Sequence, residues 1–358
     1  MMLLLMAAGA LYGYWLWWLF AGLRRLDAQR PANTIQHPYS VIIAAHNEEP
    51  NLARVLGSLV AQNYPPTLME IIVVADRCED DTAAVARTFQ REKVSLHLVE
   101  IETVAPGIPP KKNALQAGLA RASFHRFLML DADITLSHNF LATVNKQFEA
   151  GVCASVGLAV PHPRDSFWQR FLGFEKMISW CVAGSAIGWG SPILAYGSNW
   201  GYTREALEAV GGFRDIMQSL SGDDDLLVQK FGQLPGQRVT MCLNPDGWVY
   251  TDMPGNLSSF IRQRRRHFSA GKYYPPAVQL GYGLYHAANL LLWILWIFYP
   301  PAIWGLLLKL AGDFVLIRRA GVLFYQRCSL PDFFFFNGLF VLYNSLVGPL
   351  GHIGKIRW

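Results

Sequence analysis

Long apolar segments at both ends of this 358-residue chain restrict its fold more than any other feature. Residues 2–23 contain no charged side chain, and a helix of about 20 such residues can cross a bilayer. No basic residue precedes this segment and no clear cleavage site follows it, so we expect an uncleaved membrane anchor. Arg24, Arg25 and Arg30 follow directly. Because positive charge marks the cytoplasmic side of a membrane helix, we expect the chain after Leu23 to lie in the cytoplasm.

The C-terminal part of the chain, residues 276–358, contains three further apolar segments. They are residues 277–299, 301–317 and 333–351. Lys309 and Asp313 lie inside the second segment at a spacing that lets them pair on one helix face. If all three segments cross, the basic C-terminal residues would lie on the non-cytoplasmic side, against the charge rule. We therefore expect two or three membrane helices here, and one segment could instead be re-entrant or interfacial.

The middle of the chain has a different composition from its ends. Residues 40–266 resemble an ordinary globular domain, although the whole chain is 52% hydrophobic and only 16% charged. We therefore expect a cytoplasmic domain at residues 24–275. The five cysteines are scattered without metal-binding spacing, which fits reduced thiols. The net charge is only +5, and the basic residues cluster near the predicted membrane junctions, which favours anionic lipid headgroups over nucleic acid.

Strand-like and helix-like segments alternate through this middle region. Short apolar runs predict strands at residues 40–44, 70–74, 95–99 and 127–130. Helical patterns begin near residues 49 and 81 and after the loop "APGIPPKKN". Because such alternation favours parallel strands with right-handed crossovers, we expect an α/β domain with a doubly wound sheet. In such a sheet, ligands bind at the carboxyl ends of the strands.

Charged side chains follow these predicted strands, so we expect them to meet at one edge of the sheet. The acids are Glu48, Asp76, Asp131 and Asp133, and the bases are Lys111 and Lys112. Carboxylates suit a divalent cation and lysines suit phosphates, and the chain has no glycine-rich phosphate loop. The sequence thus predicts a nucleotide-diphosphate site with a divalent cation. Alternatively, Asp131 and Asp133 could cap the next helix, and one of the two lysines could lie on a solvated face. Asp80 and Asp81 are expected to cap their own helix.

Seven segments resemble, in their order, the motifs of membrane-bound family 2 glycosyltransferases with a GT-A fold. They are "VIIAAHNEE", "VVADRCEDDT", "KKNALQAGL", "LDADITL", "YGSNWGYTREALEAVGGF", "SGDDDLL" and "QRRRHF". The resemblance covers residues 39–275. It implies transfer of a sugar from a nucleotide donor, with inversion at the anomeric carbon and with Mg²⁺ or Mn²⁺ on the diphosphate.

The resemblance also implies which residues bind the donor. Ala44, Glu48 and Asp76 match positions that hold the base and the ribose. Lys111, or Lys112 in its place, matches a lysine near the donor phosphates.

Two acidic motifs carry the metal and the base in this resemblance. In the D-A-D segment, Asp133 would bind the metal and Asp131 would assist on the donor side. In "SGDDDLL", Gly222 stands where the family has a glutamate, and Asp223 takes the position of the general base that accepts the acceptor's proton. Asp224 is the neighbouring candidate. Repulsion among adjacent acids would raise at least one pKa toward useful basicity.

Two further motifs concern the leaving group and the acceptor. "QRRRHF" resembles the Q-x-x-R-W motif, with Gln263, Arg264 and Arg266 as the matching residues, and arginines hold a diphosphate well through bidentate bonds. His267 stands in place of the tryptophan that helps to position the acceptor in the family. Asn199, in "GSNWGY", falls on the acceptor side. The basic segment could equally contact anionic lipid.

Residues 167–181 carry apolar side chains at spacings of four and three, which predicts one apolar helix face. Packing of this face against the sheet is the first interpretation. The alternative is an interfacial segment, about residues 165–196, that lies in the membrane surface and frames the entry of a lipid acceptor.

Together these features predict an integral, multi-pass membrane glycosyltransferase that moves a sugar to a membrane lipid, with a UDP-sugar as the first expectation for the donor. Two alternatives stay open. One is a processive polysaccharide synthase with a glycan acceptor, against which the small number of C-terminal helices and His267 argue. The other is an inactive GT-A fold that serves as a membrane scaffold, against which the intact set of acids and lysines argues.

Overall fold

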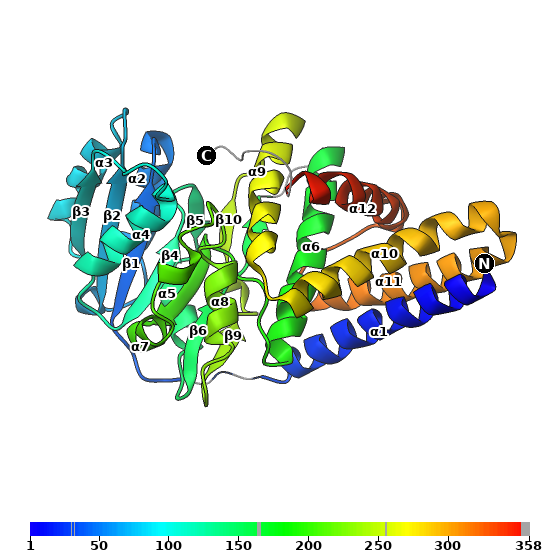
Figure 1. Cartoon of the computed structure of the whole chain (residues 1–358). Helices are drawn as coiled ribbons and strands as arrows, with labels where there is room; N and C mark the ends of the chain where they lie inside the picture. The colour runs from blue at the N-terminus through cyan, green and yellow to red at the C-terminus, as the bar shows by residue number, and fades with distance from the viewer. Residues whose placement is uncertain (30, 32, 163–165, 255, 352–358) are drawn as a thin grey trace. The chain divides into compact units, whose positions relative to one another are not determined.

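The computed structural model describes all residues except 30, 32, 163–165, 255 and 352–358. Lys355 and Arg357, on which the predicted membrane topology partly depends, lie outside the described residues. The chain divides into two compact units (Figure 1). The helical unit comprises residues 1–29, 163–189 and 254–358, and the sheet unit comprises residues 30–162 and 190–253.

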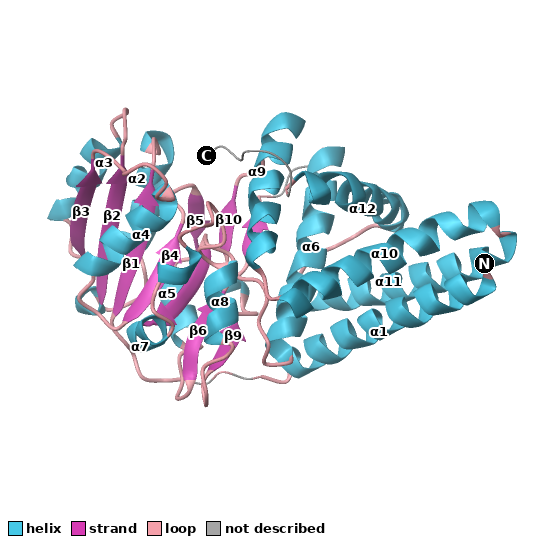
Figure 2. Cartoon of the chain, viewed as in Figure 1, coloured by secondary structure: helices cyan, strands magenta, loops and turns pink. Residues whose placement is uncertain are grey.

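The sheet unit is built on a seven-stranded sheet in the order β3-β2-β1-β4-β8-β6-β9 (Figure 2). Its strands are β1 Tyr39–Ala45, β2 Met69–Asp76, β3 Ser95–Ile101, β4 Arg126–Leu130, β6 Val152–Val156, β8 Asn199–Thr203 and β9 Arg238–Met241. β1 to β4 are parallel, as the sequence predicted. β8 runs antiparallel to both β4 and β6, whereas β6 and β9 are parallel to each other. Of the seven strands, β8 alone therefore runs against the others, and the sheet is mixed. A strand can form its backbone hydrogen bonds in either a parallel or an antiparallel pair. An apolar run in the sequence therefore does not indicate in which direction its strand runs.

A small second sheet and six α-helices complete the described part of this unit. The small sheet has the order β5-β10-β7, with β5 Ile134–Leu136, β7 Ala159–Pro161 and β10 Val249–Thr251. The helices are α2 Glu49–Val60, α3 Thr82–Thr88, α4 Pro110–Arg121, α5 Phe140–Asn145, α7 Arg204–Ala209 and α8 Asp225–Phe231.

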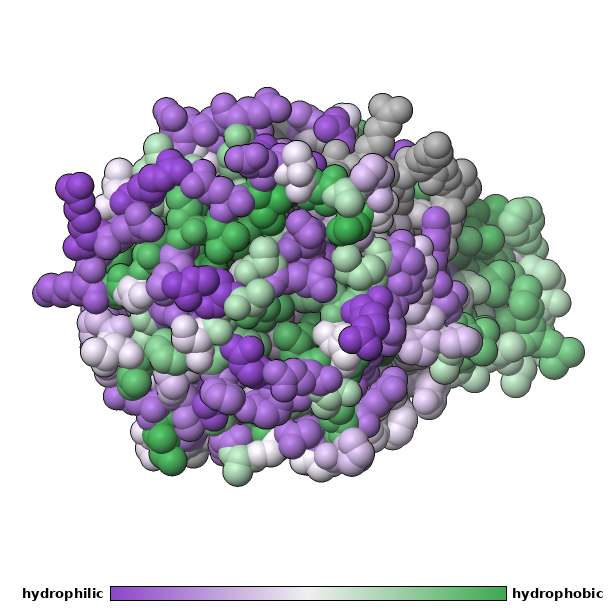
Figure 3. Space-filling view, turned by 60° about the vertical axis from the view of Figure 1, so that its left-hand side comes forward, coloured by the Kyte–Doolittle hydropathy of each residue, from purple (hydrophilic) through white to green (hydrophobic). Residues whose placement is uncertain are grey.

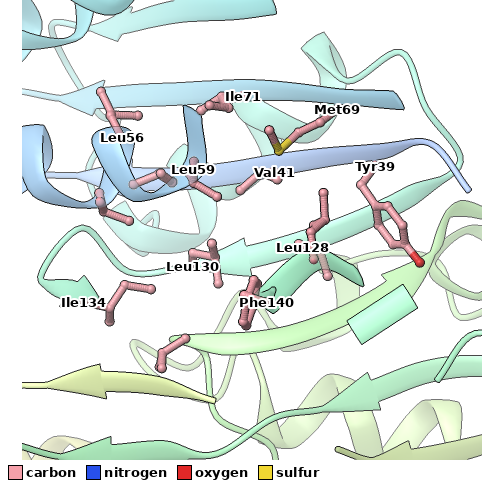
Figure 4. Packing of buried hydrophobic residues seen from close by; sticks show 14 of the residues in the cluster. Tyr39, Val41, Leu56, Leu59, Met69, Ile71, Leu128, Leu130, Ile134 and Phe140 are labelled. Atoms are coloured by element: carbon pink, nitrogen blue, oxygen red, sulfur yellow. The ribbon is translucent and has the colours of Figure 1, made fainter. Parts of the chain in front are cut away.

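The core of the sheet unit lies between the strands and α2. α2 presents Leu52, Val55, Leu56 and Leu59 at helical spacing, and all four are buried. They pack with residues of β1 and β2 such as Val41 (Figure 4). Every residue of β2 is buried, as expected for a strand covered on both faces. This packing fixes the strands, and with them the positions of the loops at their carboxyl ends.

The residues of the helical unit that the structure describes form six α-helices. They are α1 Met2–Asp27, α6 Phe167–Gly188, α9 Leu257–Ala270, α10 Pro276–Phe298, α11 Ile303–Leu323 and α12 Leu330–Leu350. α6 crosses α1 closely, and a methyl group added at Gly22 would lie 2.5 Å from the Ser185 carbonyl oxygen. The apolar face predicted on α6 packs against helices, with Phe171 and Phe174 contacting Phe336 of α12. The sequence favoured the sheet as the partner of this face, because a buried face does not identify what covers it.

Among the described residues, four helices are long and apolar enough to cross a membrane, namely Met2–Asp27, Pro276–Phe298, Pro300–Leu323 and Leu330–Leu350. Their surfaces expose large apolar side chains such as Leu3, Phe298 and Leu308. Figure 3 shows a broad apolar surface at its right-hand end, where the helical unit lies. The length and apolar surface of these helices are those expected of segments that contact lipid.

A buried polar cluster lies among these apolar helices. Lys309 and Asp313 pair as predicted, with Lys309 Nζ 2.7 Å from Asp313 Oδ2. The Tyr12 hydroxyl of α1 donates to Asp313 Oδ1 at 2.6 Å, and the Asn337 amide of α12 donates to Asp313 Oδ2 at 2.8 Å. The cluster therefore ties α1, α11 and α12 together around one ion pair.

Candidate active site

The first two strands of the sheet unit end in left-handed turns, at Asn47 (φ 57°) and Arg77 (φ 51°). The Arg77 guanidinium folds back on Asp76, with Nε and Nη2 each 2.9 Å from a carboxylate oxygen. His46 Nδ1 lies 2.6 Å from the Asp76 carbonyl oxygen. The sequence did not predict this contact of Arg77, because successive residues of a strand point to opposite faces of the sheet. The left-handed turn at Arg77 directs its side chain toward the Asp76 carboxylate. The predicted base-binding position is thus an Asp76–Arg77 ion pair.

Hydrogen bonds join the loops that follow β1 and β2. The Glu48 N–H donates to Thr82 Oγ1 at 2.8 Å, and the Glu79 N–H donates to Asn47 Oδ1 at 2.8 Å. Asp80 Oδ1 accepts the Thr82 N–H at 3.1 Å, whereas Asp81 makes no side-chain capping bond. Asp80 therefore caps α3 as expected, and the side-chain capping expected of Asp81 is wrong. Glu48 lies in a loop whose backbone is fixed from the neighbouring strand end.

Ala44 lies near the end of β1, where it pairs in register with Val74 of β2. It is half-buried, unlike most of its strand. The two predicted base-side positions, Ala44 and Asp76, therefore lie on adjacent parallel strands of one sheet edge. Their role in binding a base stays a prediction.

Lys111, in the first turn of α4, connects the two acidic motifs. Its Nζ lies 3.1 Å from Asp131 Oδ1 and 3.6 Å from Asp223 Oδ2. Burial alone would lower the pKa of the Lys111 ammonium, but the charges of Asp131, Asp223 and Asp224 outweigh it and raise the pKa above its usual range. Lys111 is therefore a permanent cation placed between a candidate metal ligand and a candidate base.

Lys112, the next residue, contacts backbone instead of carboxylates. It is fully buried, and its Nζ donates to the carbonyl oxygens of Ile216, Ser219 and Ser221 at 2.6, 2.7 and 2.9 Å. Burial lowers the pKa of Lys112 to about 8, whereas three carbonyl acceptors require the three N–H donors of the protonated ammonium. The solvated alternative is wrong for Lys112, and Lys111 is left as the candidate for donor phosphates.

Asp131 and Asp133 lie in the turn between β4 and β5. Because a strand follows them and α5 begins only at Phe140, they do not cap a helix. Burial, together with the charges of Asp131 and Glu48, raises the pKa of Asp133 to about 6. These carboxylates therefore gather negative charge that a hard divalent cation would neutralise.

Among the described residues, no group of three or more His, Cys, Asp or Glu side chains is arranged to hold a metal ion. Mg²⁺ is commonly held by one or two carboxylates together with substrate phosphates. Asp131 and Asp133 fit that arrangement, in which the donor diphosphate would supply the remaining oxygen ligands.

The second acidic motif begins at Gly222, whose φ of 77° suits glycine. Asp224 Oδ2 accepts the Gly197 N–H at 2.7 Å, and Asp224 Oδ1 accepts the Asp225 N–H at 2.8 Å. Burial and the charge of Asp223 raise the pKa of Asp224. Because both oxygens of Asp224 already accept backbone bonds, Asp223 is the better candidate for the general base.

Gly197 is a second residue that sequence reasoning missed. A methyl group added there would lie 3.2 Å from Lys111 Nζ and 3.2 Å from Asp224 Oδ2. The Gly197 backbone therefore lies against the acid–lysine cluster, and a larger residue at this position would displace Lys111 or Asp224. The only signal in the sequence was its place in the segment "YGSNWGY".

Asn199, the first residue of β8, is buried. Its amide donates to the carbonyl oxygens of Leu158 and Gly247 at 2.9 and 3.1 Å. These bonds tie β8 to two neighbouring loops, and the predicted acceptor contact of Asn199 stays a prediction.

The basic motif lies on α9 of the helical unit. Arg264 is buried, and its Nη2 lies 2.5 Å from Glu175 Oε2 of α6. Gln263 and Arg266 are half-buried, and His267 is exposed. The ion pair with Glu175 gives Arg264 a role inside the helical unit. Binding of the leaving diphosphate by Gln263, Arg264 and Arg266, and the acceptor contact of His267, stay predictions.

A mixed α/β sheet with an acid–lysine cluster at the carboxyl ends of its parallel strands is the arrangement expected of a glycosyltransferase with a GT-A fold. The chain belongs to Glycosyl transferase family 21, whose sequence model matches residues 1–297. The sequence resemblance had indicated family 2, and the enzyme class is the one it predicted.

Comparison with known proteins agrees with this class. The chain is 25% identical over 252 residues to the beta-monoglucosyldiacylglycerol synthase of Synechocystis sp., covering 65% of this chain and 51% of that protein. It is 26% identical over 240 residues to the probable glycosyltransferase YdaM of Bacillus subtilis, covering 65% and 55%. The chain thus spans about half the length of these curated relatives.

A solved structure supports the fold across the whole chain. The mannosyltransferase PcManGT from Pyrobaculum calidifontis, in complex with GDP-Man and Mn²⁺, superposes with a TM-score of 0.60 and 21% identity. The match covers 97% of this chain and 99% of that one. At this identity the likeness concerns the fold and leaves the substrates of this chain open.

Proposed function

We propose that this glycosyltransferase transfers a sugar from a nucleotide-diphospho-sugar, with UDP as the first nucleotide to test, to a membrane lipid with inversion at the anomeric carbon. One observation carries the proposal: the Lys111 ammonium lies 3.1 Å from Asp131 and 3.6 Å from Asp223. A cation suited to phosphate, an acid suited to metal and an acid suited to proton transfer therefore meet in one place.

In the proposed reaction, Asp223 accepts the proton of the acceptor hydroxyl as its oxygen bonds to the anomeric carbon. The bond between that carbon and the diphosphate oxygen breaks, and the nucleoside diphosphate leaves. Lys111 stabilises the charge that develops on the leaving group. Asp133 and Asp131 would hold Mg²⁺ or Mn²⁺, which when bound neutralises the diphosphate. Arg266, with Gln263, is proposed to assist the leaving group.

Two observations support a lipid acceptor. In the part of the chain that the structure describes, four helices are long and apolar enough to cross a membrane. One relative of the chain is a beta-monoglucosyldiacylglycerol synthase.

The side of the membrane on which the reaction takes place is a separate part of the proposal. Arg24 and Arg25 in the last turn of α1 favour a cytoplasmic site for the reaction.

The test incubates membranes that contain the protein with radiolabelled UDP- and GDP-sugars and Mg²⁺ or Mn²⁺. We expect label in the organic extract, loss of label with EDTA, and recovery when the metal is restored. Label in a polymer pellet would instead indicate the polysaccharide synthase. No label from any donor would contradict the enzyme proposal.

The base assignment has its own test. We expect Asp223→Asn to lower the rate of transfer about 10²- to 10⁴-fold, because the acceptor proton has no carboxylate to receive it, while nucleotide binding is retained. Asp215→Asn is the matched control, since Asp215 is an exposed partner of Lys230 on the same stretch of chain. An unchanged rate in Asp223→Asn would refute the base assignment.

A further inference from the structure

We propose that Lys112 is a positioning residue that holds Asp223 in place for proton transfer and does not bind the donor. This inference rests on the proposed function, in which Asp223 is the base. Lys111 and Lys112 are neighbours in the first turn of α4. They bind two different parts of the same acidic loop.

The three carbonyl groups that Lys112 binds lie just before the base in the chain. They belong to Ile216, Ser219 and Ser221, which precede Gly222 and Asp223. After the short 3₁₀ turn Arg214–Ile216, this stretch forms no helix or strand until α8 begins at Asp225. The backbone conformation of this stretch therefore depends on contacts with other elements. Lys112 provides three such contacts, through its bonds to the carbonyl oxygens of Ile216, Ser219 and Ser221.

The burial of Lys112 explains why this contact matters. Its side chain is fully buried at 0% exposure, and its direct contacts are to carbonyl oxygens. A buried ammonium with three short charge-assisted bonds is a strong and directional link. If the ammonium is removed, three inward-facing carbonyl groups lose a donor, and the stretch loses the contact that fixes it to α4.

Gly222 connects the backbone that Lys112 binds to Asp223. Its φ of 77° is a conformation that side chains rarely adopt, and it turns the chain from Ser221 into the acidic motif. Asp223 then faces Lys111, whose ammonium lies 3.6 Å from Oδ2. α4 thus contacts both the side chain of the base and the backbone that carries it. A shift of about 1 Å in a catalytic group can cost on the order of 10²-fold in rate.

The test compares Lys112→Met with Lys111→Met in the full-length protein purified in detergent, with rates normalised to the sites that bind nucleotide. For Lys112→Met we expect a kcat about 10- to 100-fold lower and a donor KM within about 3-fold of wild type. For Lys111→Met we expect a raised donor KM. Lys230→Met is the matched control, since Lys230 binds the exposed carboxylate of Asp215 in the same stretch, and its kinetics should stay near wild type.

Hydrogen exchange supplies a readout that does not depend on activity. We expect the amides of residues 214–222 to exchange faster in Lys112→Met, while those of α2 keep their protection. If Lys112→Met does not fold, Gly222→Ala perturbs the same turn and should lower kcat without raising the donor KM.

Three results would overturn the proposal. They are a raised donor KM with unchanged kcat in Lys112→Met, unchanged exchange in residues 214–222, or a wild-type kcat in Gly222→Ala. Failure of the base assignment would show separately as an active Asp223→Asn variant, and the exchange result would still decide whether Lys112 orders the loop.

Discussion

Cys78 lies beside the ends of β1 and β2, where the base of the donor is proposed to bind. Its Sγ is 3.5 Å from the Ala45 carbonyl oxygen, and the residue is half-buried. Burial raises the pKa of Cys153 to about 11 and that of Cys242 to about 12. At pH 8, fewer than about one in a thousand of these two thiols is the reactive thiolate. We therefore expect iodoacetamide at pH 8 to modify Cys78 and to spare Cys153 and Cys242.

Nucleotide should slow the modification of Cys78 if the base binds at these strand ends. Peptide mass spectrometry with and without UDP or GDP measures both effects, and denatured protein, in which all thiols react, is the control. Because raised pKa values suppress the thiolate, Cys153 and Cys242 should begin to react as the pH rises toward 11. Equal labelling of the three thiols at pH 8, or no protection by either nucleotide, would contradict this prediction.

Neighbouring side chains of one type have different environments at two places in this chain. Lys111 contacts carboxylates while Lys112 contacts backbone carbonyls. Asp224 caps α8 while Asp223 faces Lys111. Sequence motifs identified each of these places, because strand ends and charge are visible in a sequence. They did not identify which neighbour has which role, since that depends on the rotation of the backbone at each residue.

The ion pair between Arg264 and Glu175 connects α9 to α6. Their side chains are only 6% and 12% exposed. Arg264→Met would leave the Glu175 carboxylate buried without this partner, so we expect a loss of about 3–5 kcal/mol in stability. The double variant Arg264→Met/Glu175→Leu should recover much of that loss, because neither charge is then buried alone.

Thermal unfolding of the purified protein, read as a double-mutant cycle, measures this coupling. Arg170→Met is the control, since Arg170 is 45% exposed in its pair with Asp332 and such pairs contribute about 0–1 kcal/mol. Equal effects of Arg264→Met and Arg170→Met would show that the buried pair contributes no more than an exposed one.

The elements themselves could be predicted to different extents. β1 to β4 were found within about two residues of their ends, because continuous apolar runs have few alternatives. The antiparallel β8 was not, since strand direction depends on the path of the chain through the long helix α6. The apolar face of α6 was found but not its partner, because periodicity reports burial without identifying what covers the face.

At the scale of the whole molecule, the two compact units are interleaved along the chain. The helical unit takes three segments and the sheet unit takes two. Composition predicted boundaries at residues 23 and 275, and that division stays a prediction of membrane topology. It could not show that α6 and α9 group with the apolar helices, because both lie inside the region of ordinary composition.

The bond from Tyr12 to Asp313 has a consequence for how the protein is made. The two residues are 301 positions apart, so α1 meets this partner only after residue 313 has been synthesised. All residues of the sheet unit have been synthesised by residue 253. We therefore expect the sheet unit to fold on the ribosome while the part of α1 around Tyr12 waits for α11 and α12. In nascent chains stalled after the sheet unit has left the ribosome and before residue 313 is made, the sheet unit should already resist protease and residues around Tyr12 should crosslink to helper proteins or lipid. Stable packing of the Tyr12 region in these chains would contradict this order.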